Sequence, residues 1–167
     1  MKKAYQFYAW ISRMRYITRW GLMRNTFSEN IQEHSHMVAV LAHALALIRR
    51  DILGGEADPE RCATAALFHD VGKCNVPGEI LRKKERITDA EYRLIQKHPA
   101  DSARILEPMY GPRIAELAYS HHERMDGRGY PRGLKGDEIP FEARILAVAD
   151  VFDAMTSDRG YNKVKSF

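Results

Sequence analysis

Hydrophobic residues recur along this chain at the spacing of α-helices. Phe7, Ile11 and Met14 follow the i, i+4, i+7 pattern of one helical face. A longer stretch repeats this pattern with Ile31, Val38, Leu41, Leu45 and Ile48. We find no convincing alternation of apolar and polar residues of the kind that marks a half-buried strand. The pattern therefore predicts an all-α fold.

Local signals indicate where these helices begin. Asp58 stands before a proline and can cap a helix, and Thr88 with Glu91 forms a capping-box pattern. Pro112 and Pro140 mark two further starts. The predicted helices span residues 4–17, 30–51, 59–71, 89–107 with a break before Pro99, 112–124 and 140–157. Together they predict a helical bundle.

Composition fits one globular domain, residues 1–167, without a membrane span. The chain is 45% apolar and 29% charged, and no apolar run approaches the roughly 18 residues of a transmembrane helix. Arg13, Arg15 and Arg19 interrupt any signal-peptide core near the amino terminus. Cys62 and Cys74 lack the spacing of a disulfide framework, so we expect reduced thiols. We therefore expect a cytoplasmic protein.

The net charge is mildly positive and spread along the chain. A value of +4 favours anionic ligands. It lacks the clustered basic stripe of nucleic-acid-binding proteins, so neither a DNA partner nor a membrane partner is indicated.

Five of the seven histidines stand beside acids or helix ends, in a pattern that predicts a metal centre. They are His34, His69, His98, His121 and His122. Imidazoles and carboxylates are ligands of first-row transition metals, and a carboxylate can bridge two ions. Asp70, directly after a histidine, is the natural bridge. Adjacent helical residues point about 100° apart, so the doublets favour two metals over one. Any single histidine here could be an ordinary buried side chain, but the whole set, together with Asp150, favours the metal site.

These residues resemble the H…HD…D signature of HD-domain phosphohydrolases, through His34, His69 with Asp70, and Asp150. The stretch from about 65 to 165 is similar to the HD-GYP subfamily. The matching segments are HDVGK at 69–73, HP at 98–99, HHERMDGRGYP at 121–131, IPFEARILAVADVFDAMTSDR at 139–159, and Tyr161. The resemblance implies an HD-domain helical bundle.

The resemblance also implies roles for individual residues. One metal would be held by His34, His69, Asp70 and Asp150, and a second by Asp70, His98, His121 and His122. Water or hydroxide would lie between the two ions. The many imidazole ligands themselves argue against magnesium alone and leave Fe, Mn, Ni, Co or Zn. Lys73 and Arg159 would contact the substrate phosphate. Lys73 and Asp70 would be the catalytic residues. Tyr130 would shape the mouth of the site. The implied reaction is hydrolysis of cyclic di-GMP by metal-activated water.

The first 50 residues point to a different substrate. RYITRWGLMRN at 15–25 and SENIQEHSHMVAVLAHALA at 28–46 resemble HD-domain 5'-deoxynucleotidases. In that family the pair matching Arg19 and Trp20 lines the nucleotide site. Two alternatives therefore stand beside the cyclic di-GMP phosphodiesterase: a nucleoside 5'-monophosphate phosphatase, and a catalytically silent nucleotide-binding module.

Two departures from the HD-GYP pattern affect these expectations. Asn30 stands four residues before His34, where members with a third metal carry Glu, and this argues against a third ion. The sequence ends at Phe167, before the closing helices usual in HD-GYP domains. We therefore expect part of the substrate groove to be missing or to be supplied by another subunit of a homo-oligomer.

Overall fold

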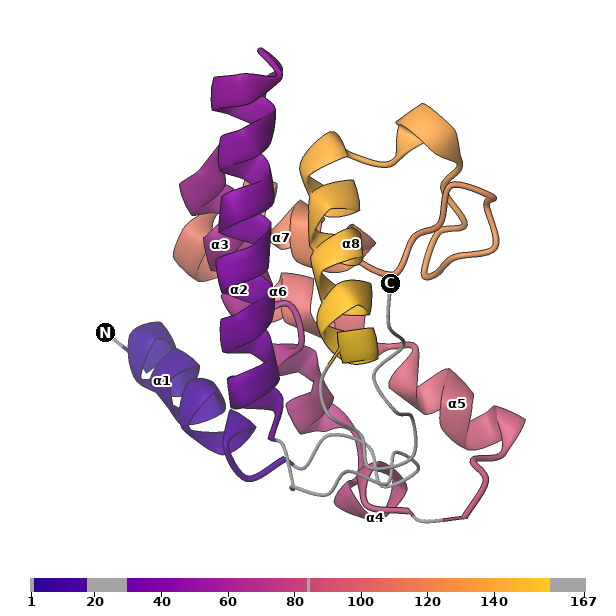
Figure 1. The fold of residues 1–167 in the computed structure, drawn as a ribbon. Helices are drawn as coiled ribbons and strands as arrows, with labels where there is room; N and C mark the ends of the chain where they lie inside the picture. Colours follow the sequence, from indigo (N-terminus) through magenta and orange to yellow (C-terminus); the bar gives the residue numbers. More distant parts are fainter. Residues whose placement is uncertain (1, 18–29, 84, 157–167) are drawn as a thin grey trace.

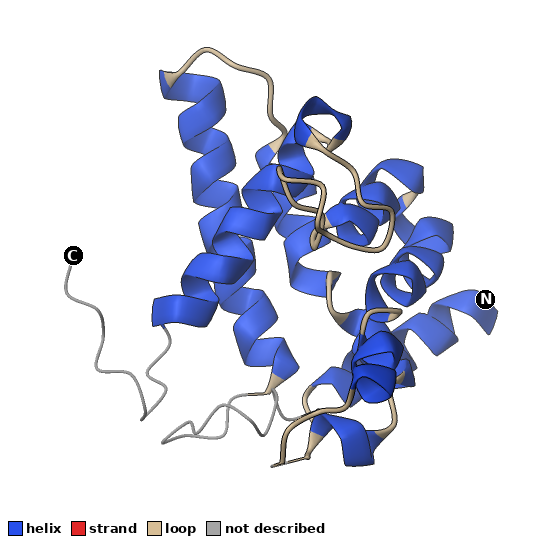
Figure 2. Ribbon diagram, turned by 90° about the vertical axis from the view of Figure 1, so that its right-hand side faces the viewer, coloured by secondary structure: helices blue, strands red, loops and turns tan. Residues whose placement is uncertain are grey.

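The computed structural model describes residues 2–17, 30–83 and 85–156, and in this part of the chain the predicted all-α fold is confirmed (Figures 1 and 2). None of the helices described there has both the length and the apolar character needed to span a bilayer. The helices are α1 (Lys2–Met14), α2 (Ile31–Leu47), α3 (Pro59–Phe68), α4 (Gly78–Leu81), α5 (Asp89–Ile95), α6 (His98–Tyr110), α7 (Pro112–Ser120) and α8 (Phe141–Thr156).

Side-chain caps begin three of these helices. Asp58 accepts a hydrogen bond from the N–H of Arg61 at the start of α3. Thr88 and Glu91 form the predicted capping box at the start of α5. Asn30 forms a second box with Glu33, each side chain accepting from the other's backbone N–H at 3.0 Å. These bonds satisfy N–H groups that have no partner within the helix. They therefore set where each helix begins.

The core lies where α2, α3, α7 and α8 meet. Figure 1 shows α2 and α8 side by side, with α3 and α7 behind them. Small side chains dominate this contact and let the helix backbones approach closely: Ala42, Ala46, Ala65, Ala66, Ala143 and Ala149 are all buried. A second cluster, which includes Phe7, Met14, Val71 and Leu106, attaches α1 and α6. The two clusters pack together the helices that carry the candidate ligands.

Several predicted helices end earlier than the sequence suggested. The helix predicted over 59–71 stops at Phe68 and a 3₁₀ turn follows at Val71–Asn75, while the helix predicted over 112–124 stops at Ser120. The segment 30–51 is α-helical to Leu47 and then forms a π-helical turn, Ile48–Ile52. The segment 89–107 is split into α5 and α6, as the predicted break before Pro99 implies. Helix α4 was not predicted.

Candidate metal centre

Three candidate ligands lie where helices end. His69 follows α3, His121 follows α7, and His98 begins α6 just beyond the end of α5 at Ile95. In each case Nδ1 contacts the backbone carbonyl three residues earlier, at 2.6, 2.7 and 2.6 Å respectively. The last carbonyls of a helix lack intrahelical partners, so each imidazole satisfies one of them. The early ends of α3 and α7 thus orient the ligands.

These contacts determine which ring nitrogen carries the proton. A carbonyl can only accept, so Nδ1 of each ring donates and the neutral imidazole presents a lone pair at Nε2. Nε2 of His98 lies 3.2 Å from Nε2 of His121 and 3.2 Å from Oδ1 of Asp70. Nε2 of His69 is buried without a hydrogen-bond partner among the described residues, 3.5 Å from Oδ2 of Asp70. Lone pairs and a carboxylate converge here, as in a site for a cation.

Asp70 stands at the centre of this group and is 1% exposed. Burial alone would raise the pKa of its carboxyl group, but the neighbouring Lys73 ammonium is the largest of the opposing influences, which hold that pKa well below its usual range. Asp70 is therefore a carboxylate at neutral pH. A buried anion of this kind needs a compensating charge.

The turn after Asp70 packs directly against α6. A Cβ on Gly72 would lie 2.1 Å from the carbonyl oxygen of His98 and 2.6 Å from the N–H nitrogen of Ser102. The Gly72 N–H donates to Oγ of Ser102 at 2.9 Å. Glycine therefore allows the close approach that brings Asp70 to His98.

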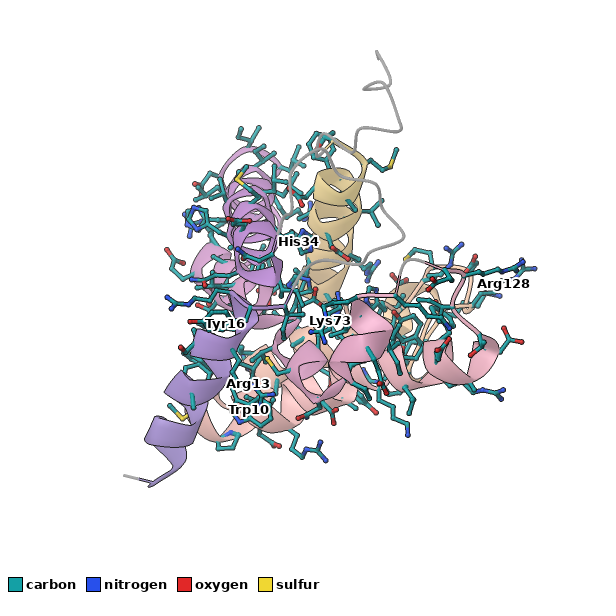
Figure 3. The ribbon with its side chains drawn as sticks, turned by 90° about the horizontal axis from the view of Figure 1, so that it is seen from below. Trp10, Arg13, Tyr16, His34, Lys73 and Arg128 are labelled. Atoms are coloured by element: carbon teal, nitrogen blue, oxygen red, sulfur yellow. The ribbon has the colours of Figure 1, made fainter. Side chains whose placement is uncertain are left out.

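His34 and Asp150 complete the other side of the centre, from α2 and α8. Nε2 of His34 lies 3.0 Å from Oδ1 of Asp150, and Nε2 of His69 lies 4.0 Å from the same oxygen. Burial would raise the pKa of Asp150, but its close contact with His34 and the nearby His69 lower it overall, so this carboxylate too is charged. Figure 3 places His34 between α2 and α8.

The loop after α7 adds His122 and Tyr130. Their rings lie 4.7 Å apart, centroid to centroid. Burial, followed by the neighbouring His98, lowers the pKa of His122 to about 3, so its imidazole is neutral at physiological pH. A Cβ on Gly129 would lie 2.4 Å from the backbone nitrogen of Arg124, so glycine is required for the loop to fold back beside His122.

The ligand atoms fall into two groups that share Asp70, and the donor set fits divalent metal ions. In each group the ligand atoms lie within 4.8 Å of one another: His34, His69 and Asp70 in one, and Asp70, His98, His121 and His122 in the other. Imidazole and carboxylate together suit first-row transition metals. Sharing of one buried carboxylate is the arrangement that a bridging ligand requires.

Lys73 lies in the 3₁₀ turn, with its ammonium group 2.5 Å from Oδ2 of Asp70. Its side chain is 19% exposed and faces the cavity described below. The other predicted phosphate contacts, Arg19 and Arg159, lie outside the described residues, as do Trp20 and Tyr161. The structure therefore places only part of the predicted substrate site.

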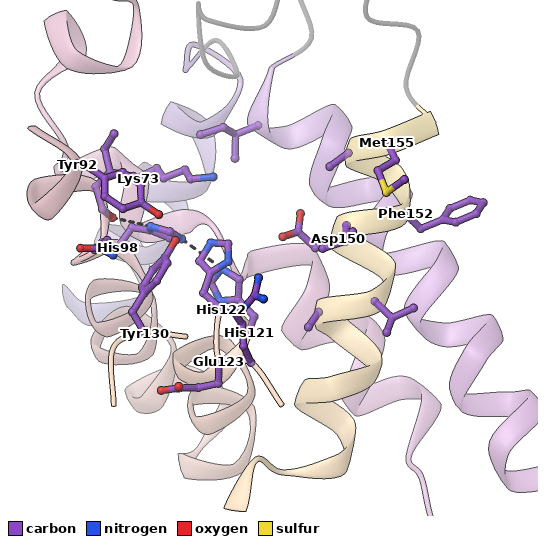
Figure 4. A pocket seen from close by; sticks show the side chains of 18 of the residues that line it. Lys73, Tyr92, His98, His121, His122, Glu123, Tyr130, Asp150, Phe152 and Met155 are labelled. Atoms are coloured by element: carbon purple, nitrogen blue, oxygen red, sulfur yellow. Dashed lines mark hydrogen bonds between the residues drawn. The ribbon is translucent and has the colours of Figure 1, made fainter. Parts of the chain in front are cut away.

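A cavity of about 1070 Å³ opens from the metal-ligand side chains. Figure 4 shows Lys73 and Tyr92 on one side of it and Asp150, Phe152 and Met155 of α8 on the other. Arg128 lines the cavity too, and Figure 3 places it at the edge of the molecule. Sequence reasoning gave no role to Tyr92, which lies outside every quoted motif, or to Arg128, which lies within HHERMDGRGYP but is not a metal-ligand type. Both become visible only once α5 and the loop after α7 face the same cavity.

Comparison with known proteins identifies relatives of this chain. A family model described as an HD domain matches residues 22–167. A 3'3'-cGAMP-specific phosphodiesterase of Vibrio cholerae is 39% identical over 146 residues, which cover 87% of this chain and 31% of that protein. A cyclic di-GMP phosphodiesterase of Pseudomonas aeruginosa is 42% identical over 134 residues, covering 78% of this chain and 32% of that protein. The chain thus spans about a third of the length of the curated relatives it matches.

A solved structure supports the fold independently. An HDG"Y"P protein from Bdellovibrio bacteriovorus aligns with a TM-score of 0.61 and 23% identity, covering 78% of this chain and 42% of that chain. At this identity the likeness concerns the fold.

Proposed function

Because this chain belongs to the HD-domain family, we propose that it hydrolyses a phosphodiester at a two-metal centre and that its substrate is cyclic di-GMP. The observation that carries the proposal is the pair of ligand groups that share Asp70 beside a large cavity. The curated relatives named as cyclic-dinucleotide phosphodiesterases support the same substrate class.

In this proposal each group of ligands holds one divalent ion of Fe, Mn, Ni, Co or Zn. The first is held by His34, His69, Asp70 and Asp150, and the second by Asp70, His98, His121 and His122. When bound, such ions lower the pKa of water and polarise phosphoryl oxygens. Two divalent ions against the two carboxylates of Asp70 and Asp150 leave a charge of about +2, which suits an anionic ester.

The chain's own groups position the substrate. The Lys73 ammonium has three donors, of which one serves Oδ2 of Asp70. The others are available to a non-bridging phosphate oxygen, where charge builds up in the transition state. Tyr130 and His122 form one wall of the site and keep the phosphate on the side that Lys73 faces. Asp70 thus both orients Lys73 and bridges the ligand groups.

The size of the cavity favours a dinucleotide over a mononucleotide. A volume of about 1070 Å³ slightly exceeds the roughly 300–1,000 Å³ typical of small-molecule sites. The ring of Tyr92, 41% exposed, offers a nucleobase a stacking surface away from the metal ligands. The Arg128 guanidinium is available to a second phosphate or a base edge. A nucleoside monophosphate would not contact both of these side chains.

A nucleoside 5'-monophosphate phosphatase is the second candidate, favoured by Arg19 and Trp20 in the amino-terminal segment. The full set of ligands opposes the third reading, a catalytically silent nucleotide-binding module. One paired assay decides among them. Purified protein loaded with metal is given cyclic di-GMP and, separately, 5'-dAMP, and the linear product and inorganic phosphate are measured. We expect cleavage of cyclic di-GMP, and release of phosphate from 5'-dAMP alone would overturn the proposed substrate.

Three variants make this assay more specific. In a cyclic di-GMP phosphodiesterase, Arg159→Ala should raise KM or lower kcat, whereas Arg19→Ala should matter little. In a monophosphatase, Arg19→Ala should cripple hydrolysis of 5'-dAMP, because the dianionic monoester loses a bidentate guanidinium partner. Trp20→Ala should then weaken discrimination between ribose and deoxyribose.

A further inference from the structure

His34 is held differently from the histidines that follow α3, α5 and α7. Its Nδ1 lies 2.6 Å from Oδ2 of Asp153, a carboxylate of α8 that is 119 positions away in the sequence. Both side chains are buried, with 1% and 7% of their surface exposed. The backbone orients His69, His98 and His121, whereas a carboxylate on another helix orients His34.

The position of His34 explains why a side chain is needed. His34 lies inside α2, where the carbonyl three residues earlier, that of Ile31, is an acceptor for the helix's own N–H groups. The carbonyls that His69, His98 and His121 contact are at helix ends and lack such partners. An acceptor for Nδ1 of His34 must therefore come from a neighbouring element. Helix α8 packs on α2 and supplies it.

Two carboxylates of α8, one turn apart, bracket the imidazole. Asp150 approaches Nε2 at 3.0 Å, and Asp153 approaches Nδ1 at 2.6 Å. In the proposed centre Asp150 shares an ion with Nε2 of His34. Asp153 lies against the opposite nitrogen, Nδ1.

We propose that Asp153 is a positioning residue that makes His34 a ligand of the first metal. The inference rests on the proposed two-metal centre. The carboxylate can only accept, so Nδ1 keeps its proton and Nε2 presents its lone pair to the ion. The negative charge also increases the basicity of the imidazole, as carboxylates behind metal-bound histidines do. Only the first metal depends on this contact between α2 and α8.

The decisive variant is Asp153→Asn, which keeps the size of the side chain and removes its charge. An amide can turn its NH₂ group towards Nδ1, so it no longer selects one tautomer. We expect the first Zn²⁺ equivalent to bind about 10–100-fold more weakly, the range seen when such outer partners are removed. The second equivalent, held by Asp70, His98, His121 and His122, should keep its affinity. Chelator competition with Zn²⁺, together with elemental analysis, measures both.

A matched control is Glu142→Gln, which alters another α8 carboxylate that joins α8 to a neighbouring helix. Glu142 accepts from the backbone N–H of Asp58 and from Arg61, and contacts no imidazole among the described residues. This variant should keep both Zn²⁺ affinities. Circular dichroism establishes that both variants remain helical, so a lost equivalent is not a lost fold.

A spectroscopic readout separates positioning from packing. In the Zn²⁺-loaded protein, ¹⁵N-edited NMR should show His34 with a downfield Nδ1–H proton, identified by its loss in His34→Gln. In Asp153→Asn that proton should move upfield, because the charge-assisted hydrogen bond is gone. Unchanged Zn²⁺ affinities in Asp153→Asn, or equal loss of both equivalents, would overturn the role assigned to Asp153. Absence of cyclic di-GMP cleavage by the wild type would instead defeat the proposed substrate and leave this metal-binding result standing.

Discussion

The ammonium group of Lys73 lies 2.5 Å from Oδ2 of Asp70, the carboxylate that both candidate ligand groups share. Lys73, proposed to bind phosphate, is therefore in direct contact with Asp70, proposed to bridge the metals. The 3₁₀ turn Val71–Asn75 makes this possible, because it brings a side chain three residues later back over Asp70. The contact provides two separable predictions, one for each partner.

Replacing Lys73 should lower turnover and leave the metals in place. Lys73→Ala removes one electrostatic donor to the phosphate, a loss of about 2–4 kcal/mol in transition-state stabilisation. Steady-state kinetics with cyclic di-GMP and elemental analysis measure the two effects. Lys83→Ala is the control, since that ammonium pairs at 2.7 Å with Glu91, away from the ligands. Wild-type kinetics in Lys73→Ala would contradict the proposed contact between Lys73 and the phosphate.

Replacing Asp70 should empty both metal positions. Its carboxylate belongs to each ligand group, so Asp70→Ala removes a ligand from two ions at once. His98→Ala should release mainly the second ion, because His98 belongs to one group only. Elemental analysis of the purified variants reports the stoichiometry. Full metal content in Asp70→Ala contradicts the bridging assignment.

Gly72 should tolerate no side chain. A Cβ would overlap the carbonyl oxygen of His98, at 2.1 Å, so Gly72→Ala must push the turn away from α6. We expect a loss of about 1–3 kcal/mol in the free energy of unfolding, together with weaker metal binding. Gly111→Ala is the control, because a Cβ there would strain the backbone, at a φ of +81°, without overlapping any neighbouring atom. That control should lose about 1–3 kcal/mol and keep its metals.

Tyr92 should contribute to binding of a large substrate and not to the chemical step. Tyr92→Ala should raise KM for cyclic di-GMP, by the equivalent of about 1–3 kcal/mol if one base stacks on the ring. Hydrolysis of bis(p-nitrophenyl) phosphate, which lacks nucleobases, should be unaffected. Leu94→Ala is a matched control on α5, since Leu94 is 39% exposed and does not line the cavity. An equal effect of Tyr92→Ala on both substrates would remove the stacking role.

The two cysteines should be unreactive in the folded protein. Burial raises the pKa of Cys62 to about 12 and that of Cys74 to about 11, from an ordinary value of 9.0. The neutral thiol therefore persists at pH 8, and the thiolate is the reactive form. Iodoacetamide at pH 8 should modify neither residue until denaturant is added, as read by mass spectrometry. The same shifts mean that folding stability falls as the pH rises above about 9, where the unfolded thiols ionise first. Rapid alkylation of the native protein would contradict the prediction that both thiols are unreactive.

Local sequence determined the features whose partners lie within a few residues. The cap at Asp58 and the box of Thr88 and Glu91 were predicted and form, because their bonds span one helical turn. The candidate ligands were also visible in the sequence, since doublets of histidine and acid carry a chemical signal of their own. Helix α4 was missed because four residues are too short to show periodicity.

Only the tertiary structure decided how those residues face one another. The pairing of His34 with Asp153 joins α2 to α8 across 119 positions, and no local pattern encodes that separation. The fit of Gly72 beneath His98, and the placement of Tyr92 on the cavity wall, likewise depend on how helices pack. Periodicity tells which face of a helix is buried but not which neighbour buries it. The ligand types were therefore a property of the sequence, whereas their convergence on Asp70 is a property of the packed helices.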